Sequence, residues 1–288
     1  MSADMSTGMS VGVITFSPQG LKVMEQISAS MEVDQYLHEA IAAPPGVSSF
    51  ARVYSLTQQI FRHYAGLVYI APCGVVVRAI APLIESKLCD PAVVCVDVGG
   101  RYAVSLLSGH EGGANDLALN IANCIGAEPV ISTTTETVKD LIVGIGCRKG
   151  KNAAEIRHAI SAALALVDLP LERVRFLASA DVKAQEAGLL LAAEELAIPL
   201  RIIDSALIRL STRPFGHSDF VATHVQLPAV SEPAALLAGR RTSLILQKTA
   251  FNGITIAIAQ ENCTSLGLAP AAPMIAPDAP SALSAPAK

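Results

Sequence analysis

The stretch from Ser105 to Asp116 constrains the fold most, because it joins a buried strand to a helix through three glycines. The apolar residues 102–107 predict the strand, and apolar residues at helical spacing predict a helix from Ala114 to Ile125. A strand, a glycine-rich turn and a helix in this order are typical of α/β proteins, which place their ligands at the carboxyl ends of strands. The stretch therefore predicts both a fold class and a candidate site.

The turn holds an imidazole and a carboxylate, those of His110 and Glu111, between glycines. Glycine has no Cβ, so a ligand can approach the backbone closely. Free N–H groups at the start of a helix also attract anionic or carbonyl oxygen atoms. A purely structural turn with a surface histidine is the alternative, and it is favoured for an arbitrary glycine-rich turn. Two titratable groups fixed by glycines favour a functional site here.

Composition excludes several classes of function. Of the 288 residues, 51% are hydrophobic, 16% are charged and none is Trp, as in parallel sheets covered by helices on both faces. A net charge of −4 offers no global attraction to nucleic acid. No apolar run approaches the roughly 18 residues of a membrane span, and residues 1–10 lack the features of a secretory signal. We therefore expect a cytoplasmic protein with no nucleic-acid or membrane partner.

The cysteines and histidines indicate neither a disulfide framework nor a metal site. The six cysteines form no Cys-x-x-Cys pair, and most fall within apolar patterns. We expect them to be reduced and mostly buried. Four histidines, at positions 38, 63, 158 and 217, show no metal-ligand spacing, and His110 and His224 would converge only through the fold.

The pattern of strands and helices divides the chain into two α/β units. It runs from residue 9 to 132, is interrupted by the polar run 133–137, and restarts with a strand at 141–145. We expect two three-layer α/β domains with mostly parallel sheets, residues 1–137 and 138–262, with a cleft between them. The Ala/Pro-rich residues 263–288 are expected to be a disordered tail.

Individual elements follow from the same patterns. Residues 50–64 have the spacing of a helix, residues 97–101 form a hairpin-like turn, and Asn152 with Glu155 has the spacing of a capping box. The other expected strands are 9–16, 66–71, 92–98, 102–107, 128–132, 174–178, 200–203, 243–247 and 254–259.

A second glycine-rich turn, residues 144–150, fits neither common nucleotide-binding motif. A dinucleotide fingerprint needs Gly where Lys149 stands, and a P-loop ending at residue 151 needs Ser or Thr where Asn152 stands. What remains is Gly146 before a helix, with Arg148 and Lys149 in one turn, which suits the binding of carboxylates. A solvated basic turn explains these residues equally well.

Three further polar residues occupy the ends of predicted elements. Asp181 and Lys183 follow a strand, so they could face a ligand, although a surface ion pair is the alternative. Glu232 begins a short helix, and taken alone it is better explained as a helix cap than as a catalytic acid.

Several segments together resemble one family. Leu-Ser-Gly-His-x-Gly-Gly-Ala-Asn at 107–115 and Gly-Ile-Gly-Cys-Arg-x-Gly at 144–150 are its most specific motifs, and segments 71–82, 90–97, 178–183 and 231–236 match as well. They resemble cobalt-precorrin-5A hydrolases of cobalamin biosynthesis, over residues 9–260. Longer members carry an extra segment between the halves, whereas here the halves join near residues 133–140. The second half alone also resembles a stand-alone protein of the aerobic cobalamin route.

The resemblance implies a reaction of the oxygen-independent pathway. The substrate is a cobalt-bearing, methylated tetrapyrrole with acetate and propionate arms and a δ-lactone. Water opens the lactone and a C–C bond breaks, so that acetaldehyde leaves and cobalt-precorrin-5B remains. The cobalt arrives with the substrate, so the resemblance implies no cofactor and no protein metal site. Neighbouring methyltransferases of the pathway are potential partners.

The resemblance also implies roles for residues. His110 and Glu111 would transfer protons, and a helix start would stabilise an oxyanion. Arg78, Arg148 and Lys149 would hold carboxylate arms. The remaining residues expected to bind substrate are Ser108, Gly109, Gly112, Gly113, Asn115, Gly146, Asp181, Lys183 and Glu232.

Two other classes of protein remain open from the sequence. One is a non-catalytic carrier or chaperone that binds a tetrapyrrole in the same pockets. The other is an α/β hydrolase acting on a different lactone or acyl substrate, although the lack of Gly-x-Ser-x-Gly disfavours a serine nucleophile. If His110 is not the base, Asp97, Asp181 and Glu232 are the next candidates.

Overall fold

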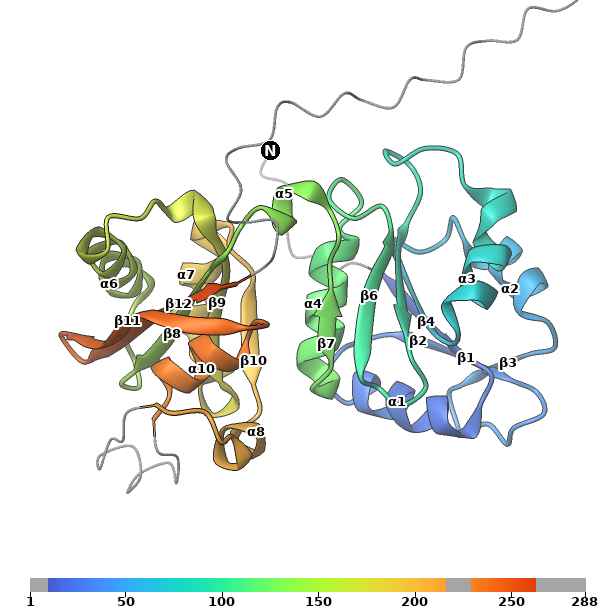
Figure 1. The fold of residues 1–288 in the computed structure, drawn as a ribbon. Coiled ribbons are helices and arrows are strands. Elements are labelled where there is room, and N and C mark those ends of the chain that lie inside the picture. Colours follow the sequence, from blue (N-terminus) through green and yellow to red (C-terminus); the bar gives the residue numbers. More distant parts are fainter. Residues whose placement is uncertain (1–9, 216–228, 263–288) are drawn as a thin grey trace, which may run out of the picture.

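The computed structural model describes residues 10–215 and 229–262, which form two α/β halves side by side (Figure 1). Each half has one sheet. The first sheet has five parallel strand pairs and one antiparallel pair, and the second has two of each, so most pairs are parallel and the predicted α/β fold class is confirmed. The tail expected at 263–288 lies outside the described residues, as do His217 and His224.

The first sheet has seven strands in the order β3-β2-β1-β4-β5-β6-β7. Its strands are β1 (Val11–Thr15), β2 (Asp34–His38), β3 (Ser48–Phe50), β4 (Gly66–Ile70), β5 (Ala92–Val96), β6 (Tyr102–Leu107) and β7 (Glu128–Val130). Helices α1 and α4 cover one face of this sheet, and α2 and α3 cover the other. Their bounds are α1 (Pro18–Ser28), α2 (Val53–Ile60), α3 (Cys73–Ile80, followed by the 3-10 turn Ala81–Leu83) and α4 (Ala114–Ile125).

The second sheet has five strands in the order β10-β9-β8-β12-β11. They are β8 (Leu141–Cys147), β9 (Val174–Ala180), β10 (Leu200–Ile203), β11 (Thr242–Phe251) and β12 (Ile254–Glu261). Helices α6 and α7 pack on one face of this sheet, and α8 and α10 pack on the other. Their bounds are α6 (Ala153–Leu166), α7 (Ala187–Leu196), α8 (Ser205–Leu210) and α10 (Ser231–Leu237), and the short α5 (Thr134–Thr137) precedes β8.

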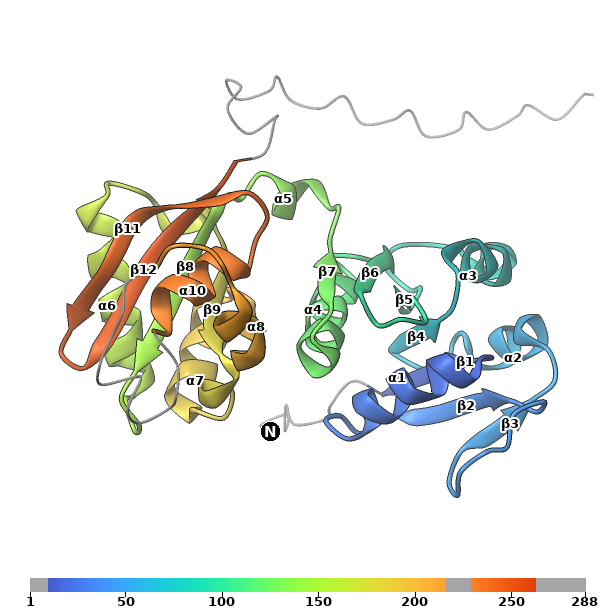
Figure 2. The ribbon, with the colours of Figure 1, turned by 60° about the horizontal axis from the view of Figure 1, so that its bottom comes forward.

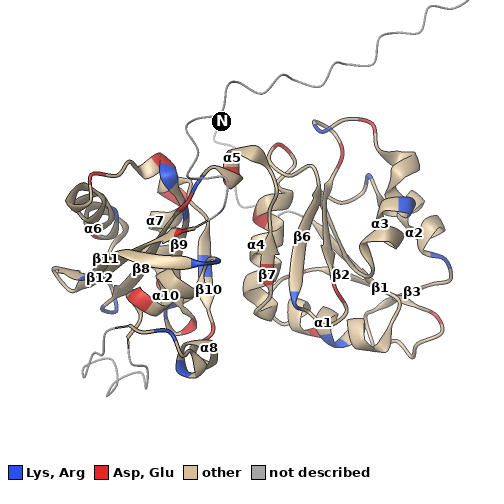
Figure 3. Ribbon diagram, in the orientation of Figure 1, with Lys and Arg blue, Asp and Glu red and all other residues tan. Residues whose placement is uncertain are grey.

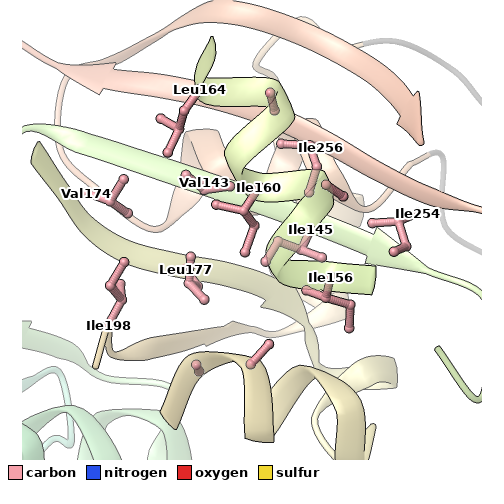
Figure 4. Close-up of a cluster of buried hydrophobic side chains, with 14 of the residues drawn as sticks. Val143, Ile145, Ile156, Ile160, Leu164, Val174, Leu177, Ile198, Ile254 and Ile256 are labelled. Carbon is pink, nitrogen blue, oxygen red and sulfur yellow. The ribbon is translucent and has the colours of Figure 1, made fainter. Parts of the chain in front are cut away.

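The largest core cluster of the second half lies between its sheet and α6 (Figure 4). Ile156, Ile160 and Leu164 recur at helical spacing and are buried against strand residues such as Val143 and Ile145. Full burial of each such side chain contributes about 1.5–3 kcal/mol. The helix starts where expected, because Asn152 and Glu155 form the predicted capping box. This core holds the carboxyl end of β8 in place.

The hairpin-like turn expected at 97–101 is present and sets the direction of β6. The carboxylate of Asp97 accepts hydrogen bonds from the backbone N–H groups of Arg101 (2.7 Å) and Tyr102 (2.8 Å). β6 therefore runs antiparallel to β5, with Val96 beside Ala103 and Val93 beside Leu107. As a result, the carboxyl end of β6 lies at the sheet edge opposite to the carboxyl ends of β1, β4 and β5.

The two halves meet along α4 and β10. The side-chain amide of Asn123 on α4 donates to Leu200 O (2.8 Å) and accepts from Ile202 N (3.0 Å), so it pairs with the edge strand as a neighbouring strand would. Leu119, also on α4, belongs to the core cluster of the second half. Figures 1 and 2 both show α4 and the edge strand β7 on the side of the first half that faces the second half.

Some expected elements differ from those observed. The helix expected at 50–64 is shorter, because Phe50 belongs to β3 and its ring packs against His38 of β2. The polar run 133–137 contains the short helix α5. The five described cysteines are free, as expected, but Cys73 and Cys89 are exposed rather than buried. No helix in the described part of the chain is long and apolar enough to cross a membrane.

Candidate functional site

The turn between β6 and α4 is held by its own backbone. Ser108 has a left-handed conformation (φ 58°), and its carbonyl oxygen accepts hydrogen bonds from the N–H groups of Gly112 and Ala114, both at 3.1 Å. The carbonyl of Gly109 accepts from Asn115 N at 2.9 Å. The expectation that the first amides of α4 are free for a ligand is therefore wrong for Ala114 and Asn115, because the turn itself binds both N–H groups.

The glycines of this turn are required by packing. A Cβ at Gly109 would lie 2.7 Å from Thr133 Cγ2, and one at Gly112 would lie 2.4 Å from Ser108 Cβ. Gly113, which directly precedes α4, has φ 82°, a left-handed conformation that glycine adopts readily. The glycines thus let the turn close on itself, so close approach of a ligand is not needed to explain them.

Asn115 is buried and joins three segments. Its side-chain oxygen accepts a hydrogen bond from Ser105 Oγ on β6 (2.8 Å), and its nitrogen donates to Thr133 Oγ1 (2.9 Å). These bonds fix α4 against β6 and against the chain that leads to the second half. Asn115 therefore positions the turn, although it was expected to bind substrate.

His110 and Glu111 lie at the exposed tip of the turn. Lys87, from the segment before β5, donates a hydrogen bond to Glu111 Oε1 at 2.5 Å. This hydrogen bond, helped by the positive charges of Lys87 and His110, lowers the pKa of the Glu111 carboxyl below its usual value. Glu111 is therefore an ionised, paired carboxylate, which makes His110 the better proton-transfer group of the two.

Three charged residues missed by the sequence analysis form an electrostatic network that includes His110. Asp116 lies in the first turn of α4, and its pKa is raised by partial removal of its carboxyl from water and by the negative charge of Glu136. The charges of His110 and Lys139 act to lower the pKa of Asp116. Lys139 also pairs with Glu136 at 2.8 Å. Glu136 lies in the polar run 133–137 and Lys139 lies just after it, and neither carries a sequence signal of a site.

Asp116 also borders two grooves beside α4. One, of about 540 Å³, lies between α4 and the segment from α7 to β10. The other, of about 700 Å³, lies between α4 and residues 31–34. Space for a ligand therefore adjoins the first turn of α4.

Ser108 has a buried hydroxyl with no hydrogen-bond partner among the described residues. Its left-handed backbone is uncommon for a residue other than glycine, and such strain gathers at functional sites. Ser108 therefore stays a candidate, but its oxygen is covered by the turn itself.

Arg78 lies on α3, which follows the carboxyl end of β4. Its Nη1 donates to Gly74 O of the same helix (2.9 Å), and the side chain is exposed. Because β6 runs antiparallel to β5, α3 starts at the sheet edge opposite to the turn that holds His110. Arg78 and His110 therefore belong to different edges of the first sheet.

The turn after β8 presents two exposed cations. Arg148 and Lys149 have no ion pair within the described residues, whereas Lys151 pairs with Glu155 at 2.7 Å. The backbone of Arg148 is fixed by a hydrogen bond from its N–H group to Gly253 O (3.0 Å). Gly146 is required by packing, because a Cβ there would lie 2.6 Å from Thr255 Oγ1.

Asp181 and Lys183 each have another partner, so the alternative of an ion pair between them is wrong. Asp181 accepts hydrogen bonds from Ser205 Oγ and from Ser205 N (3.1 Å), which fixes the start of α8. Lys183 pairs with Glu186 at 2.9 Å and thereby lowers the pKa of that carboxyl. Both residues lie at the same sheet edge as Arg148, because β8 and β9 are parallel.

Glu232 is buried at the start of α10 and accepts a hydrogen bond from Lys248 N of β11 (2.8 Å). This contact ties the helix to the edge of the second sheet. It gives Glu232 a structural role, whereas binding of substrate and catalysis stay predictions.

The two glycine-rich turns lie at opposite ends of β8. The first contacts Thr133, shortly before β8 starts, and the second follows Cys147, where β8 ends. Seven strand residues at about 3.3 Å each separate the ends by roughly 20 Å. Charged residues are likewise scattered over both halves (Figure 3). Within residues 10–215 and 229–262, no group of three His, Cys, Asp or Glu side chains is arranged to hold a metal.

Comparison with known families matches both halves. The family described as "Cobalamin synthesis G N-terminal" matches residues 55–136, and "Cobalamin synthesis G C-terminus" matches residues 141–259. The first match contains the turn with His110, and the second contains the turn with Arg148.

Three curated relatives are similar to the chain. Cobalt-precorrin-5A hydrolase of Salmonella typhimurium is 34% identical over 44% of this chain and 36% of its own length. The probable cobalt-precorrin-5A hydrolase of Methanocaldococcus jannaschii is 24% identical over 88% of this chain and 100% of its own length. Protein CobE of a Sinorhizobium species is 33% identical over 44% of this chain and 83% of its own length. The chain therefore matches only about a third of the Salmonella relative.

Proposed function

The chain belongs to the cobalamin synthesis G family and has a role in cobalamin biosynthesis, and on that premise we propose that it is a cobalt-precorrin-5A hydrolase. In the proposed reaction, water opens the δ-lactone of a cobalt-bearing tetrapyrrole. A two-carbon fragment then leaves as acetaldehyde, and cobalt-precorrin-5B is the product. The cobalt is part of the substrate.

The observation that carries the proposal is the exposed imidazole of His110 on a rigid turn, close to Asp116. Imidazole is the side chain most often used for proton transfer by enzymes. Asp116, whose pKa is raised, supplies a second group able to exchange protons. Paired Glu111 and Lys87 hold the tip of the turn.

The proton balance of the reaction uses these groups. As the water oxygen bonds to the lactone carbonyl carbon, His110 takes a proton from the water, and the ring C–O bond breaks. The hydroxyl freed by this step loses its proton while the adjacent C–C bond breaks, which releases the aldehyde. The macrocycle carbon that loses the fragment gains a proton. One base that becomes an acid can serve both steps.

The groove of about 540 Å³ beside Asp116 supports binding of part of a large ligand at α4. Arg148 and Lys149 lie at the other end of β8, so the proposal places the chemistry at the first turn alone. Binding of carboxylates by Arg148 and Lys149 is a separate prediction.

Incubation of the full chain with the lactone intermediate, followed by trapping and quantifying acetaldehyde, tests the proposal. We expect one aldehyde per lactone consumed, and a product whose mass differs from that of the lactone by the gain of one water and the loss of one acetaldehyde. A lactone that is bound but returned unchanged would identify a carrier instead. Release of a hydroxy acid with no aldehyde would identify a hydrolase of a different kind.

A further inference from the structure

A small pocket at the junction of the two halves is lined by three arginines. It has a volume of about 150 Å³ and lies between β7 of the first half and β9, β10 and the segment after α10 of the second. Its charged lining residues are Glu128, Arg175, Arg201, Arg240 and Glu261, and this arginine pocket carries no motif noted in the sequence. Arg240 and Glu128 are exposed at its mouth, with side chains 77% and 44% accessible.

Arg201 is the buried base of the arginine pocket. The residue is 8% exposed, and its Nη2 donates to Ala127 O at 2.6 Å. Its Nε and Nη1 are buried and have no hydrogen-bond partner among the described residues. A buried charge whose donors are unpaired is costly, so something that pairs with them would be bound favourably.

The carboxylates of the pocket pair with the other two arginines, although the charge of Glu128 also acts on Arg201. Arg175 Nη1 pairs with Glu261 at 2.6 Å, and Arg240 Nε lies 3.5 Å from Glu128 Oε1. Arg175 also stacks its guanidinium over the ring of Phe176 at 4.7 Å, which fixes its plane. Arg175 Nε is a further buried donor with no partner among the described residues.

We propose that the arginine pocket binds one carboxylate group, held by Arg201 at the junction of the two halves. Charge-assisted hydrogen bonds from guanidinium to carboxylate are about twice as strong as neutral ones. The volume fits a carboxylate with a carbon or two, since a water molecule takes about 30 Å³ of liquid. Burial also lowers the pKa of Arg201 to about 10, a penalty that a bound anion would reverse.

The carboxylate bound in the arginine pocket has two candidate sources. A free small carboxylate would occupy the pocket as a ligand that joins the halves. An acetate or propionate arm of the tetrapyrrole would occupy it while the ring lies outside the mouth, and this second source rests on the proposed function. Either source needs the guanidinium of Arg201.

Thermal unfolding of the full chain tests the proposal, with sodium acetate replacing sodium chloride at constant ionic strength. We expect a saturable rise of the unfolding midpoint in the natural protein, and no rise in Arg201→Met. Arg209→Met, which removes an exposed arginine of α8 that has no ion pair among the described residues, is the matched control and should respond as the natural protein does. Each variant is compared with itself in chloride, so a change in its own stability cancels.

Arg240→Met provides a second variant, at the mouth of the pocket, if Arg201→Met does not fold. The acetate concentration that gives half of the maximal rise of the unfolding midpoint should be higher in Arg240→Met than in the natural protein. The proposal is overturned if acetate gives no rise in the natural protein, or if both pocket variants respond as fully as the control.

A porphyrin that bears acetate and propionate arms separates the two sources. Acetate that displaces this porphyrin in the natural protein, but not in Arg201→Met, supports an arm in the pocket. Acetate that raises the midpoint without displacing the porphyrin supports a free carboxylate. Because acetaldehyde release is measured separately, the pocket proposal and the proposed reaction can fail independently.

Discussion

The two glycine-rich turns have the same local architecture and opposite electrostatic organisation. Each joins the carboxyl end of a strand, β6 or β8, to a helix with one buried face, and each contains glycines that packing requires. Near the first turn, the cations Lys87 and Lys139 from other segments are paired with carboxylates, and His110 is exposed at the tip. In the second, Arg148 and Lys149 have no ion pair among the described residues, although Lys151 is paired with Glu155.

The difference shows how similar turns can be suited to different chemistry. The first turn satisfies the start of its helix with its own carbonyls, so its exposed side chains are an imidazole and carboxylates. The second caps its helix with Asn152 and Glu155 and leaves positive charge outside. Proton transfer suits the first arrangement, and electrostatic attraction of carboxylates suits the second.

Substitution of His110 should have the largest effect, because it removes the proposed proton-transfer group. Loss of one general acid–base group costs about 10²–10⁴ in rate. We expect His110→Ala to lower kcat for acetaldehyde release by that factor, with little change in KM or in the unfolding midpoint. His158→Ala on exposed α6 is the control and should keep full activity. Full activity in His110→Ala would leave the turn with a structural role only.

Gly112→Ala should break the packing of the first turn, because the new methyl would lie 2.4 Å from Ser108 Cβ. Overpacking of this kind costs about 1–3 kcal/mol. Gly150→Ala is the counterpart in the second turn, where a Cβ meets open space and only the left-handed backbone (φ 81°) opposes it, at about 1–2 kcal/mol. Urea unfolding of both variants should rank Gly112→Ala as the less stable. The reverse order would mean that Ser108 moves aside freely.

Removal of both cations of the second turn should weaken substrate binding without slowing the chemistry. An exposed ion pair contributes at most about 1 kcal/mol, so Arg148→Ala with Lys149→Ala should raise KM by up to about thirtyfold. The dependence of KM on salt should also become weaker. Lys22→Ala on α1 is the control for the loss of a surface charge. An unchanged KM across a salt titration would identify the turn as an ordinary solvated one.

The smallest expected effect is the pH dependence of the ion pair between Glu111 and Lys87. The hydrogen bond from Lys87 lowers the pKa of Glu111 in the folded protein. The pair therefore contributes to the stability of the folded protein at pH values above the pKa of Glu in the unfolded chain, near 4.3. This contribution is lost as the pH falls through the pKa of Glu111 in the folded protein. The difference in unfolding midpoint between the natural protein and Glu111→Gln should be present at pH 7 and vanish in strong acid.

Glu155→Gln provides the matching measurement in the second turn, because Lys151 lowers the pKa of Glu155 in the same way. Its difference from the natural protein should also be lost in acid. A difference at Glu111 that persists in acid would contradict the assignment of the effect to charge.

Much of the fold could be predicted from local patterns. The strands near the centre of each sheet are apolar runs, and the capping box at Asn152 fixed the start of α6. By contrast, β2 and β3 were not expected, because β2 is only partly buried and has little apolar pattern, while Phe50 has both a strand and a helix interpretation. The spacing of residues near Phe50 cannot decide between strand and helix, because pairing with the neighbouring strand β2 makes this segment a strand.

The candidate site could be predicted only where its residues are adjacent in sequence. His110 and Glu111 belong to one motif, whereas Lys87, which pairs with Glu111, and Glu136 and Lys139, which act on Asp116, come from segments before β5 and after β7. The hairpin at 97–101 was expected. It makes β6 run antiparallel to β5, so that β6 ends at the opposite edge of the sheet and His110 is separated from Arg78. Arg201 carries no local signal at all, because its environment is made by both halves.

The contact of Asn123 with β10 has a consequence for any separated second half. Within the whole chain, one amide side chain satisfies a carbonyl and an N–H group of that edge strand. A fragment that starts near residue 138 would expose both groups, together with the apolar surface that Leu119 covers. Open strand edges attract other strands, so such a fragment would tend to self-associate through β10. In the intact protein, α4 therefore also protects the second sheet against aggregation.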